Sequence, residues 1–199
     1  SIESGKFDQI YHEHVSYFSV RSLKTLLGRA GLSIKEARIV NYHGGSLRII
    51  AQKKEVVKEE PAHVQAMIVK EETFGLFTPK LYSDFMHKNR VQRNRFMQRL
   101  HKLKEEGHSI IAVGAPAKGN TFLNFYGLNN TLIDYVTDSS PYKRGKYTPA
   151  TRIPIVSDDI FSKYGKVYAL VLSWNIAPQL KKVLEPLNKN IEFISPDGC

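Results

Sequence analysis

The spacing of hydrophobic residues changes along the chain, and its first part predicts a small, incomplete set of elements. Residues 7–11 combine aromatic and β-branched side chains, which favours a strand. Ser19 is a good helix N-cap, and the helix that follows is expected to end at Gly31. Residues 33–42 and 46–52 are extended runs on either side of a glycine pair, which predicts a hairpin. These elements contain too little core to form a complete domain.

The second part has the regular alternation of an α/β protein. After a charged linker at 53–60, a helix is expected from Pro61 towards Glu72. A longer helix is expected over 81–106, because its hydrophobic residues share one face, namely Leu81, Phe85, Phe96, Leu100 and Leu103. Strands are then expected at 109–113, 133–137, 167–172 and 191–194, separated by helices that begin at Asn120, Ser157 and Asn175. The predicted fold class is therefore α/β, with a Rossmann-like parallel sheet.

The composition is that of a core-forming protein, with 42% hydrophobic and 24% charged residues. No apolar run approaches the roughly 20 residues that cross a bilayer, so no membrane partner is expected. The single cysteine, Cys199, excludes an internal disulfide and a zinc site made of cysteines. A cytoplasmic location is expected, because the sequence shows neither a membrane-spanning run nor a signal-peptide pattern.

The formal net charge is +10, and many of the basic residues lie between Lys80 and Lys104. Two interpretations stay open for this stretch: the solvated face of a helix, or attraction of phosphorylated ligands. Neither zinc-finger spacing nor an RNP-type aromatic pattern accompanies the charge, so nucleic acid is not expected as a partner.

The sequence YHEH at residues 11–14 lies where a strand is expected to give way to a helix, and ligands of α/β sheets bind at strand ends. Three roles fit this spacing. The histidines pack or cap locally; or His12 and His14 share a metal ion with a third ligand from Glu13 or His43; or a histidine exchanges a proton with a substrate while a carboxylate orients it. Periodicity does not choose among them.

The sequence YHGGS at residues 42–46 contains His43, Gly44 and Gly45. A hairpin turn is the simplest interpretation, although glycines also let the backbone approach a ligand closely. A lipase-type oxyanion loop is disfavoured, because the chain has no Gly-x-Ser-x-Gly nucleophile motif.

The sequence GAPAKGNT at residues 114–121 occupies the place of a phosphate-binding loop, between a strand and a helix. Pro116 stands at the second glycine of the dinucleotide fingerprint and Asn120 at the lysine of a P-loop, so neither motif is matched. Gly114, Lys118, Gly119 and Asn120 are nevertheless the candidate substrate-binding residues of this loop, since it suits an anion at a helix N-terminus. A plain tight turn is the alternative.

Asp138 ends the next predicted strand, where an acidic residue often meets a ribose hydroxyl. The loop at 140–147 adds Lys143, Arg144 and two tyrosines, which suit a phosphate together with a base or sugar ring. A solvated surface turn is the other interpretation of this loop.

Taken in order, these segments resemble the sugar C-methyltransferase family, whose members methylate C3 of a nucleotide-linked 4-keto sugar. The resemblance is carried by residues 7–19 (FDQIYHEHVSYFS), 42–48 (YHGGSLR) and 114–121, and by Asp138 with 141–145 (PYKRG). It covers nearly the whole chain, and four motifs in one order are far more specific than any one of them.

The resemblance implies a domain plan and a cofactor. Residues 1–55 would be the C-terminal remnant of a SAM-dependent methyltransferase domain of class I. Residues 56–199 would be the C-methyltransferase C-terminal domain, with a helical connector at 56–106 and a Rossmann-like part at 107–199. S-adenosyl-L-methionine would be bound mainly by a region that this chain lacks, since the family's glycine-rich loop and cysteine cluster are absent, and missing N-terminal domains are expected.

The resemblance also implies residue roles. It assigns the base that removes the C3 proton to His14, with Glu13 and Tyr11 in the same site, and the nucleotide-linked keto-sugar as partner. An extended strand would place Glu13 and His14 on opposite faces, so the backbone must turn if both serve. Two alternatives remain: a non-catalytic module that binds nucleotide sugars, and a metalloenzyme that uses His12 and His14.

Overall fold

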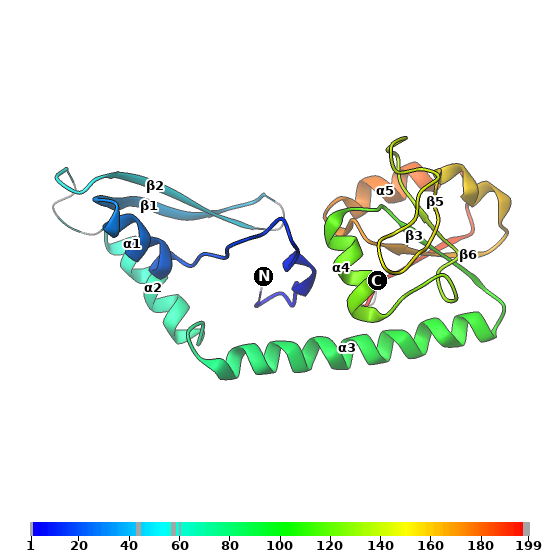
Figure 1. The fold of residues 1–199 in the computed structure, drawn as a ribbon, viewed down its shortest axis with the longest axis horizontal. Helices are drawn as coiled ribbons and strands as arrows, with labels where there is room; N and C mark the ends of the chain where they lie inside the picture. The colour runs from blue at the N-terminus through cyan, green and yellow to red at the C-terminus, as the bar shows by residue number, and fades with distance from the viewer. Residues whose placement is uncertain (1, 43–44, 57–58, 60, 197–199) are drawn as a thin grey trace. The chain divides into compact units, whose positions relative to one another are not determined.

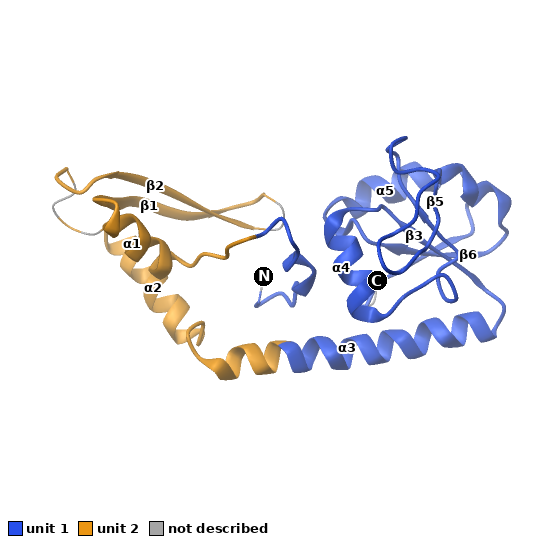
Figure 2. Cartoon of the chain, in the orientation of Figure 1, with its two compact units in different colours: residues 1–14, 86–199 blue, residues 15–85 orange. Residues whose placement is uncertain are grey.

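The computed structural model describes residues 2–42, 45–56, 59 and 61–196. The chain divides into two compact units, residues 15–85 and residues 1–14 with 86–199 (Figure 2). The expected boundary after residue 55, between a remnant of the methyltransferase domain and the C-terminal domain, stays a prediction.

The unit of residues 15–85 is built on a β-hairpin covered by two helices. Strands β1 (Leu32–Val40) and β2 (Ser46–Lys53) pair antiparallel, as predicted. Helices α1 (Val20–Arg29) and α2 (Ala62–Thr73) close a small core with the hairpin, made of Val20, Ile34, Ala37, Val64 and Ile68. The predicted cap is confirmed: the Ser19 hydroxyl accepts from the Ser22 amide at 3.0 Å. Glu71 also accepts from the Val20 amide at 2.6 Å, which fixes α2 to the start of α1.

Helix α3 (Pro79–Glu105) runs from one unit into the other. Four of the five residues predicted for its apolar face are buried, namely Phe85, Phe96, Leu100 and Leu103. The basic residues lie mostly on the exposed side, which agrees with a solvated face. Among the described residues no helix, α3 included, is long and apolar enough to cross a membrane.

The unit of residues 1–14 and 86–199 is a mixed α/β fold around a parallel sheet, which confirms the predicted fold class, and the sheet has five strands where four were predicted (Figure 1). The strands are β3 (Ser109–Val113), β4 (Tyr135–Thr137), β5 (Ile155–Val156), β6 (Val167–Val171) and β7 (Ile191–Ile194). Their order across the sheet is β5-β4-β3-β6-β7. The helical elements of this unit are η1 (Phe7–Gln9), α4 (Ala117–Tyr126), η2 (Asp158–Lys163), η3 (Trp174–Ile176) and α5 (Ala177–Leu184).

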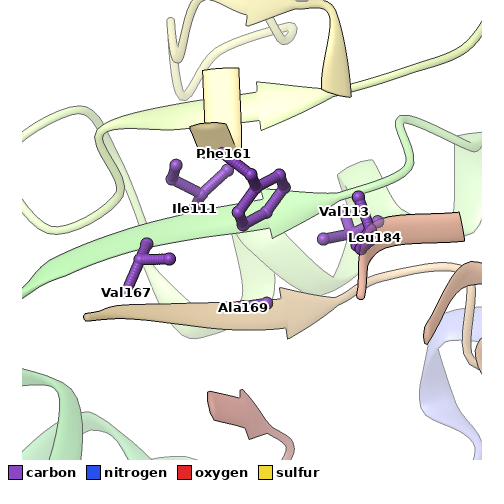
Figure 3. Close-up of a cluster of buried hydrophobic side chains, with 6 residues drawn as sticks. All are labelled: Ile111, Val113, Phe161, Val167, Ala169 and Leu184. Atoms are coloured by element: carbon purple, nitrogen blue, oxygen red, sulfur yellow. The ribbon is translucent and has the colours of Figure 1, made fainter. Parts of the chain in front are cut away.

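The core on one face of this sheet follows the period of two residues along the strands. Ile111 and Val113 of β3 lie beside Val167 and Ala169 of β6, and Phe161 packs across them (Figure 3). Leu184 of α5 completes the cluster. Ile110, Ala112 and Leu170 alternate with these residues and are equally buried, as expected for a sheet that is covered on both faces.

The prediction and the structure differ at several elements. Residues 7–11 do not form a strand, because Phe7 anchors a 3-10 turn in which the Ile10 amide donates to the Phe7 carbonyl at 2.9 Å. Strand β5 was not predicted, because two residues after Pro154 are too short to show a period. The single helix expected from Asn175 to Leu187 is instead η3 followed by the shorter α5.

Candidate functional site

The sheet reverses its order of strands beside β3, and this reversal builds the candidate site. From β3 the chain moves outward to β4 and β5, then returns to place β6 on the other side of β3. The chain therefore leaves β3 and β6 in opposite directions at the carboxyl ends of these strands, which is where α/β folds bind ligands. Gly114 has φ +84°, and a Cβ there would lie 2.3 Å from Ser173 Oγ. Only glycine lets the two turns approach so closely.

Helix α4 begins at this crevice, four residues earlier than predicted. Asn120 is not its cap: Pro116, extended at φ −76°, ψ 162°, precedes the first helical residue, Ala117. Lys118 and Gly119 therefore lie in the first turn, whose amide groups precede the first intrahelical donors. A Cβ on Gly119 would stand 3.0 Å from Leu172 Cβ, so this glycine allows the helix to pack closely on the sheet.

A cationic cluster surrounds the indole of Trp174 beside the start of α4. The Nζ atom of Lys118 lies 3.9 Å from the ring centroid and 2.5 Å from Asn175 Oδ1. The Nζ atom of Lys6 lies 4.4 Å from the same ring. Burial lowers the pKa of Lys118; Asp8 opposes this shift and Lys6 adds to it. Two ammonium groups are thus held together at a helix N-terminus, an arrangement suited to a phosphate or diphosphate.

The N-terminal segment docks on α4 and on Trp174. Phe7 is 9% exposed and its ring lies 4.4 Å from that of Phe125. Asp8 is 5% exposed and accepts a hydrogen bond from the Trp174 indole at 2.6 Å. These contacts place YHEH and Lys118 in one compact unit, although about a hundred residues separate them in sequence.

The backbone of YHEH turns, as joint use of Glu13 and His14 requires. The His14 amide donates to the Tyr11 carbonyl at 2.9 Å, and the two rings lie 4.2 Å apart. His14 Nδ1 lies 2.8 Å from the Gln9 carbonyl oxygen. A carbonyl oxygen only accepts, so Nδ1 carries the hydrogen and the lone pair of the neutral ring is on Nε2. That tautomer suits a base that acts through Nε2.

His12 and Glu13 lie at the exposed side of the same turn. His12 Nε2 is 3.9 Å from Glu13 Oε1, and the side chains are 82% and 63% exposed. Over the residues that the structure describes, no three histidine, cysteine or carboxylate side chains gather as metal ligands would. His43, the proposed third ligand, lies outside the described residues, as does Gly44. Gly45 belongs to the hairpin unit, with φ +112°.

Asp138 and its neighbours lie at the end of β4 and bind one another. The Asp138 carboxylate accepts from the amides of Ala115 and Ser140, each at 2.9 Å, and from Lys143 Nζ at 3.1 Å. Arg144 donates through Nε to the Asp138 carbonyl at 3.0 Å. Burial alone would raise the pKa of Asp138. The hydrogen bonds from the amides of Ser140 and Ala115 and the nearby Lys143 ammonium outweigh this effect and hold the pKa below its usual value. In this structure these residues order the turns beside the site, and a contact with a ribose stays a prediction.

Four residues of the site were not predicted to act there: Lys6, Asp8, Trp174 and Asn175. One pattern would have found two of them, because Trp174 and Asn175 follow directly after a buried strand next to the Gly114 turn. Lys6 and Asp8 carry no comparable pattern, since only the docking of η1 on α4 brings them to Trp174.

Comparison with known proteins gives two matches. Residues 41–196 match the family model described as C-methyltransferase C-terminal domain. The chain is also 31% identical over 197 residues to C-methyltransferase NovU of Streptomyces niveus. That alignment includes 99% of this chain and 46% of NovU, so the chain spans about half the length of this relative.

Proposed function

This chain belongs to the C-methyltransferase family, whose C-terminal domain it carries, and we propose that it is part of an enzyme that methylates C3 of a nucleotide-linked 4-keto deoxysugar. The proposal includes a methyltransferase domain to which residues 1–55 contribute, S-adenosyl-L-methionine as cofactor, and action in the cytoplasm. The observation that carries it is the docking of residues 6–8 on Trp174 and α4, which joins the candidate base to the candidate phosphate site.

The residues fit proton removal next to a ketone. His14 accepts the C3 proton through Nε2, and the electron pair of the C3–H bond becomes an enolate. Tyr11, whose ring is tilted against that of His14, is proposed to donate to the enolate oxygen, and Glu13 to orient a histidine or contact the sugar. The diphosphate lies against Lys118 and the first turn of α4.

S-adenosyl-L-methionine supplies the methyl group that the C3 carbon takes up. The glycine-bounded turn of this chain does not fit that cofactor, because Ser173 fills the space beside Gly114 and Pro116 replaces the second glycine of a dinucleotide loop. We propose that the cofactor is held mainly by the part of the enzyme that this chain does not include.

The base is tested in the complete enzyme by following exchange of the C3 hydrogen of the keto-sugar nucleotide for deuterium, together with methyl transfer. His14→Ala is expected to lower both rates about 10²- to 10⁴-fold. His12→Ala, which removes the neighbouring exposed imidazole, is the matched control and should lower them less than about tenfold. Equal losses in the two variants would refute the assignment of His14.

The phosphate site is tested in the 199-residue chain, in which Trp174 is the only tryptophan. Titration with pyrophosphate should change the fluorescence of Trp174, because Lys6 and Lys118 lie on its ring. Lys118→Met should abolish the change, whereas Lys182→Met on α5 should preserve it. If pyrophosphate binds but the complete enzyme shows no exchange of the C3 hydrogen, the alternative of a non-catalytic binding module would be favoured.

A further inference from the structure

The segment that carries the candidate base is anchored by two buried side chains. Among residues 2–14, all of which the structure describes, Phe7 and Asp8 alone are buried. Phe7 packs on the aromatic side chains of α4, and Asp8 accepts from the Trp174 indole at 2.6 Å. His14 itself is exposed. The orientation of His14 therefore depends on whether these two anchors are docked.

A short series of contacts leads from Trp174 to the ring of His14. Asp8 binds the indole, and Gln9 follows Asp8 directly in the chain. The Gln9 carbonyl oxygen lies 2.8 Å from His14 Nδ1, so it holds the hydrogen on that nitrogen and leaves Nε2 as the acceptor. If Asp8 leaves the indole, the Gln9 carbonyl loses its fixed position and the His14 ring loses its orientation. Docking at Trp174 thus sets both the tautomer and the direction of the candidate base.

The same docked segment brings a second cation to the anion site. The Nζ atoms of Lys6 and Lys118 lie 4.4 and 3.9 Å from the centroid of the Trp174 ring. Lys6 precedes Asp8 by two positions, so its place on the ring depends on the bond between Asp8 and the indole. Burial lowers the pKa of Lys118, Asp8 opposes this shift and Lys6 adds to it, which means that the two ammonium groups repel each other. An anion bound by both ammonium groups offsets this repulsion.

A ligand shifts a conformational equilibrium by the difference between its affinities for the two states. While the segment is docked, a diphosphate meets two ammonium groups and the first turn of α4. Once the segment is released, the diphosphate meets Lys118 and the helix without Lys6. We propose that binding of the substrate's diphosphate strengthens the docking of residues 6–9 on Trp174 and thereby orients His14 for proton removal. This inference rests on the proposed function, and it makes Lys6 a substrate-binding residue and Trp174 a positioning residue for the base.

Hydrogen exchange of the Ile10 amide in the 199-residue chain tests this coupling. The amide donates to the Phe7 carbonyl at 2.9 Å, so its exchange rate reports on opening of the docked turn. Saturating pyrophosphate is expected to slow this exchange about fivefold or more. Lys6→Met leaves both anchors unchanged but removes the second ammonium group, so pyrophosphate should slow the exchange less than about twofold. Lys182→Met, at an exposed position of α5, is the matched control and should keep the full effect, and circular dichroism checks that each variant is folded.

The positioning role of Trp174 is tested in the complete enzyme with Trp174→Phe. This change keeps a flat aromatic ring for the two ammonium groups but removes the N–H group that holds Asp8. It should lower kcat for exchange of the C3 hydrogen about tenfold, because the base is no longer held in place, and raise KM by less than about fivefold. Tyr82→Phe is the control, since it removes the aromatic donor to the Leu76 carbonyl on the other unit and should change neither constant.

Pyrophosphate that binds without slowing exchange of the Ile10 amide would overturn the coupling and leave the phosphate site standing. Equal slowing in the wild-type chain and in Lys6→Met would overturn the role of Lys6. A kcat that Trp174→Phe leaves unchanged would overturn the positioning of His14 through the indole. Failure of pyrophosphate to bind at all would overturn the phosphate site of the proposed function and this inference with it.

Discussion

The indole N–H of Trp174 donates to the Asp8 carboxylate over 2.6 Å, although the two residues are 166 positions apart in the sequence. Asp8 is 5% exposed, so the bond satisfies a carboxylate that is largely removed from water. Trp174 follows β6 at the point where the sheet reverses, and Asp8 lies three positions before the first residue of YHEH. The bond therefore fixes the candidate base segment to the rim of the sheet.

Asp8→Ala should lower the free energy of unfolding by about 1–3 kcal/mol, because it leaves the indole N–H without its acceptor and opens a small void. Urea unfolding monitored by Trp174 fluorescence measures the change. Asp84→Ala is the control, since its exposed ion pair with Lys80 is worth only about 0.3–0.5 kcal/mol. Similar losses in both variants would mean that the contact with Trp174 contributes little.

Gly114→Ala should destabilise the chain by more than Gly107→Ala. Both glycines have positive φ, +84° and +81°, which costs an alanine about 1 kcal/mol. Only at Gly114 does the added Cβ meet another atom, Ser173 Oγ at 2.3 Å. Thermal unfolding of the two variants separates the clash from the backbone strain. Ser173→Ala in the Gly114→Ala background should recover part of the loss, and no recovery would argue against the clash.

Asp138→Asn should remove part of the pH dependence of stability. The pKa of Asp138 is lowered in the folded state, so its contribution is present above the ordinary value of 3.8 and is lost as the pH falls through the folded pKa. The wild-type chain should exceed the variant in stability at pH 7, and the difference should shrink in acid. Urea unfolding from pH 7 down to pH 3 measures it, with Asp84→Asn as control. A difference that stays constant with pH would contradict the role given to this carboxylate.

The sequence predicted the framework well because the buried strands are continuous apolar runs that alternate with helical segments. Ile110 to Val113 and Val167 to Leu170 are continuous buried runs, and their positions alone indicate a parallel sheet. Residues 7–11 show the limit of such patterns, since aromatic and β-branched side chains favour a strand whenever a partner strand exists. Here Phe7 packs on Phe125 instead, and this contact between distant residues cannot be found from local spacing.

The candidate site was predictable to a similar extent. Gly114, Lys118 and Gly119 were identified because a strand, a turn and a helix start succeed one another locally. Only Lys118 of the cationic cluster around Trp174 was predicted as a site residue, because Lys6 and Trp174 reach it through tertiary packing. The contact of Asp138 with a ribose stays a prediction, and no residue pattern indicated that its carboxylate accepts from two backbone amides.

Lys118→Met should separate binding from stability. Burial lowers the pKa of Lys118, so the folded chain disfavours the ammonium form relative to the unfolded chain. At pH 7 its removal should change the free energy of unfolding by less than about 0.5 kcal/mol, because the lost contacts with Trp174 and Asn175 are offset by relief of that cost. Lys104→Met should cost about 1 kcal/mol or more, since Lys104 pairs with the half-buried Asp134 at 2.9 Å.

The change of stability with pH tests the lowered pKa of Lys118. The unfolded chain keeps the Lys118 proton up to the ordinary pKa of 10.5, whereas the folded chain releases it at lower pH. Wild-type stability should therefore rise relative to Lys118→Met as the pH increases through the folded pKa towards 10.5. Urea unfolding between pH 7 and pH 10 measures this rise, and pyrophosphate titration of the same samples should show that only Lys118→Met has lost the anion. If Lys118→Met were less stable than the wild-type chain by about 1 kcal/mol or more at pH 7, Lys118 would belong to the structural framework, and the proposed offset between its contacts and the cost of its buried charge would be wrong.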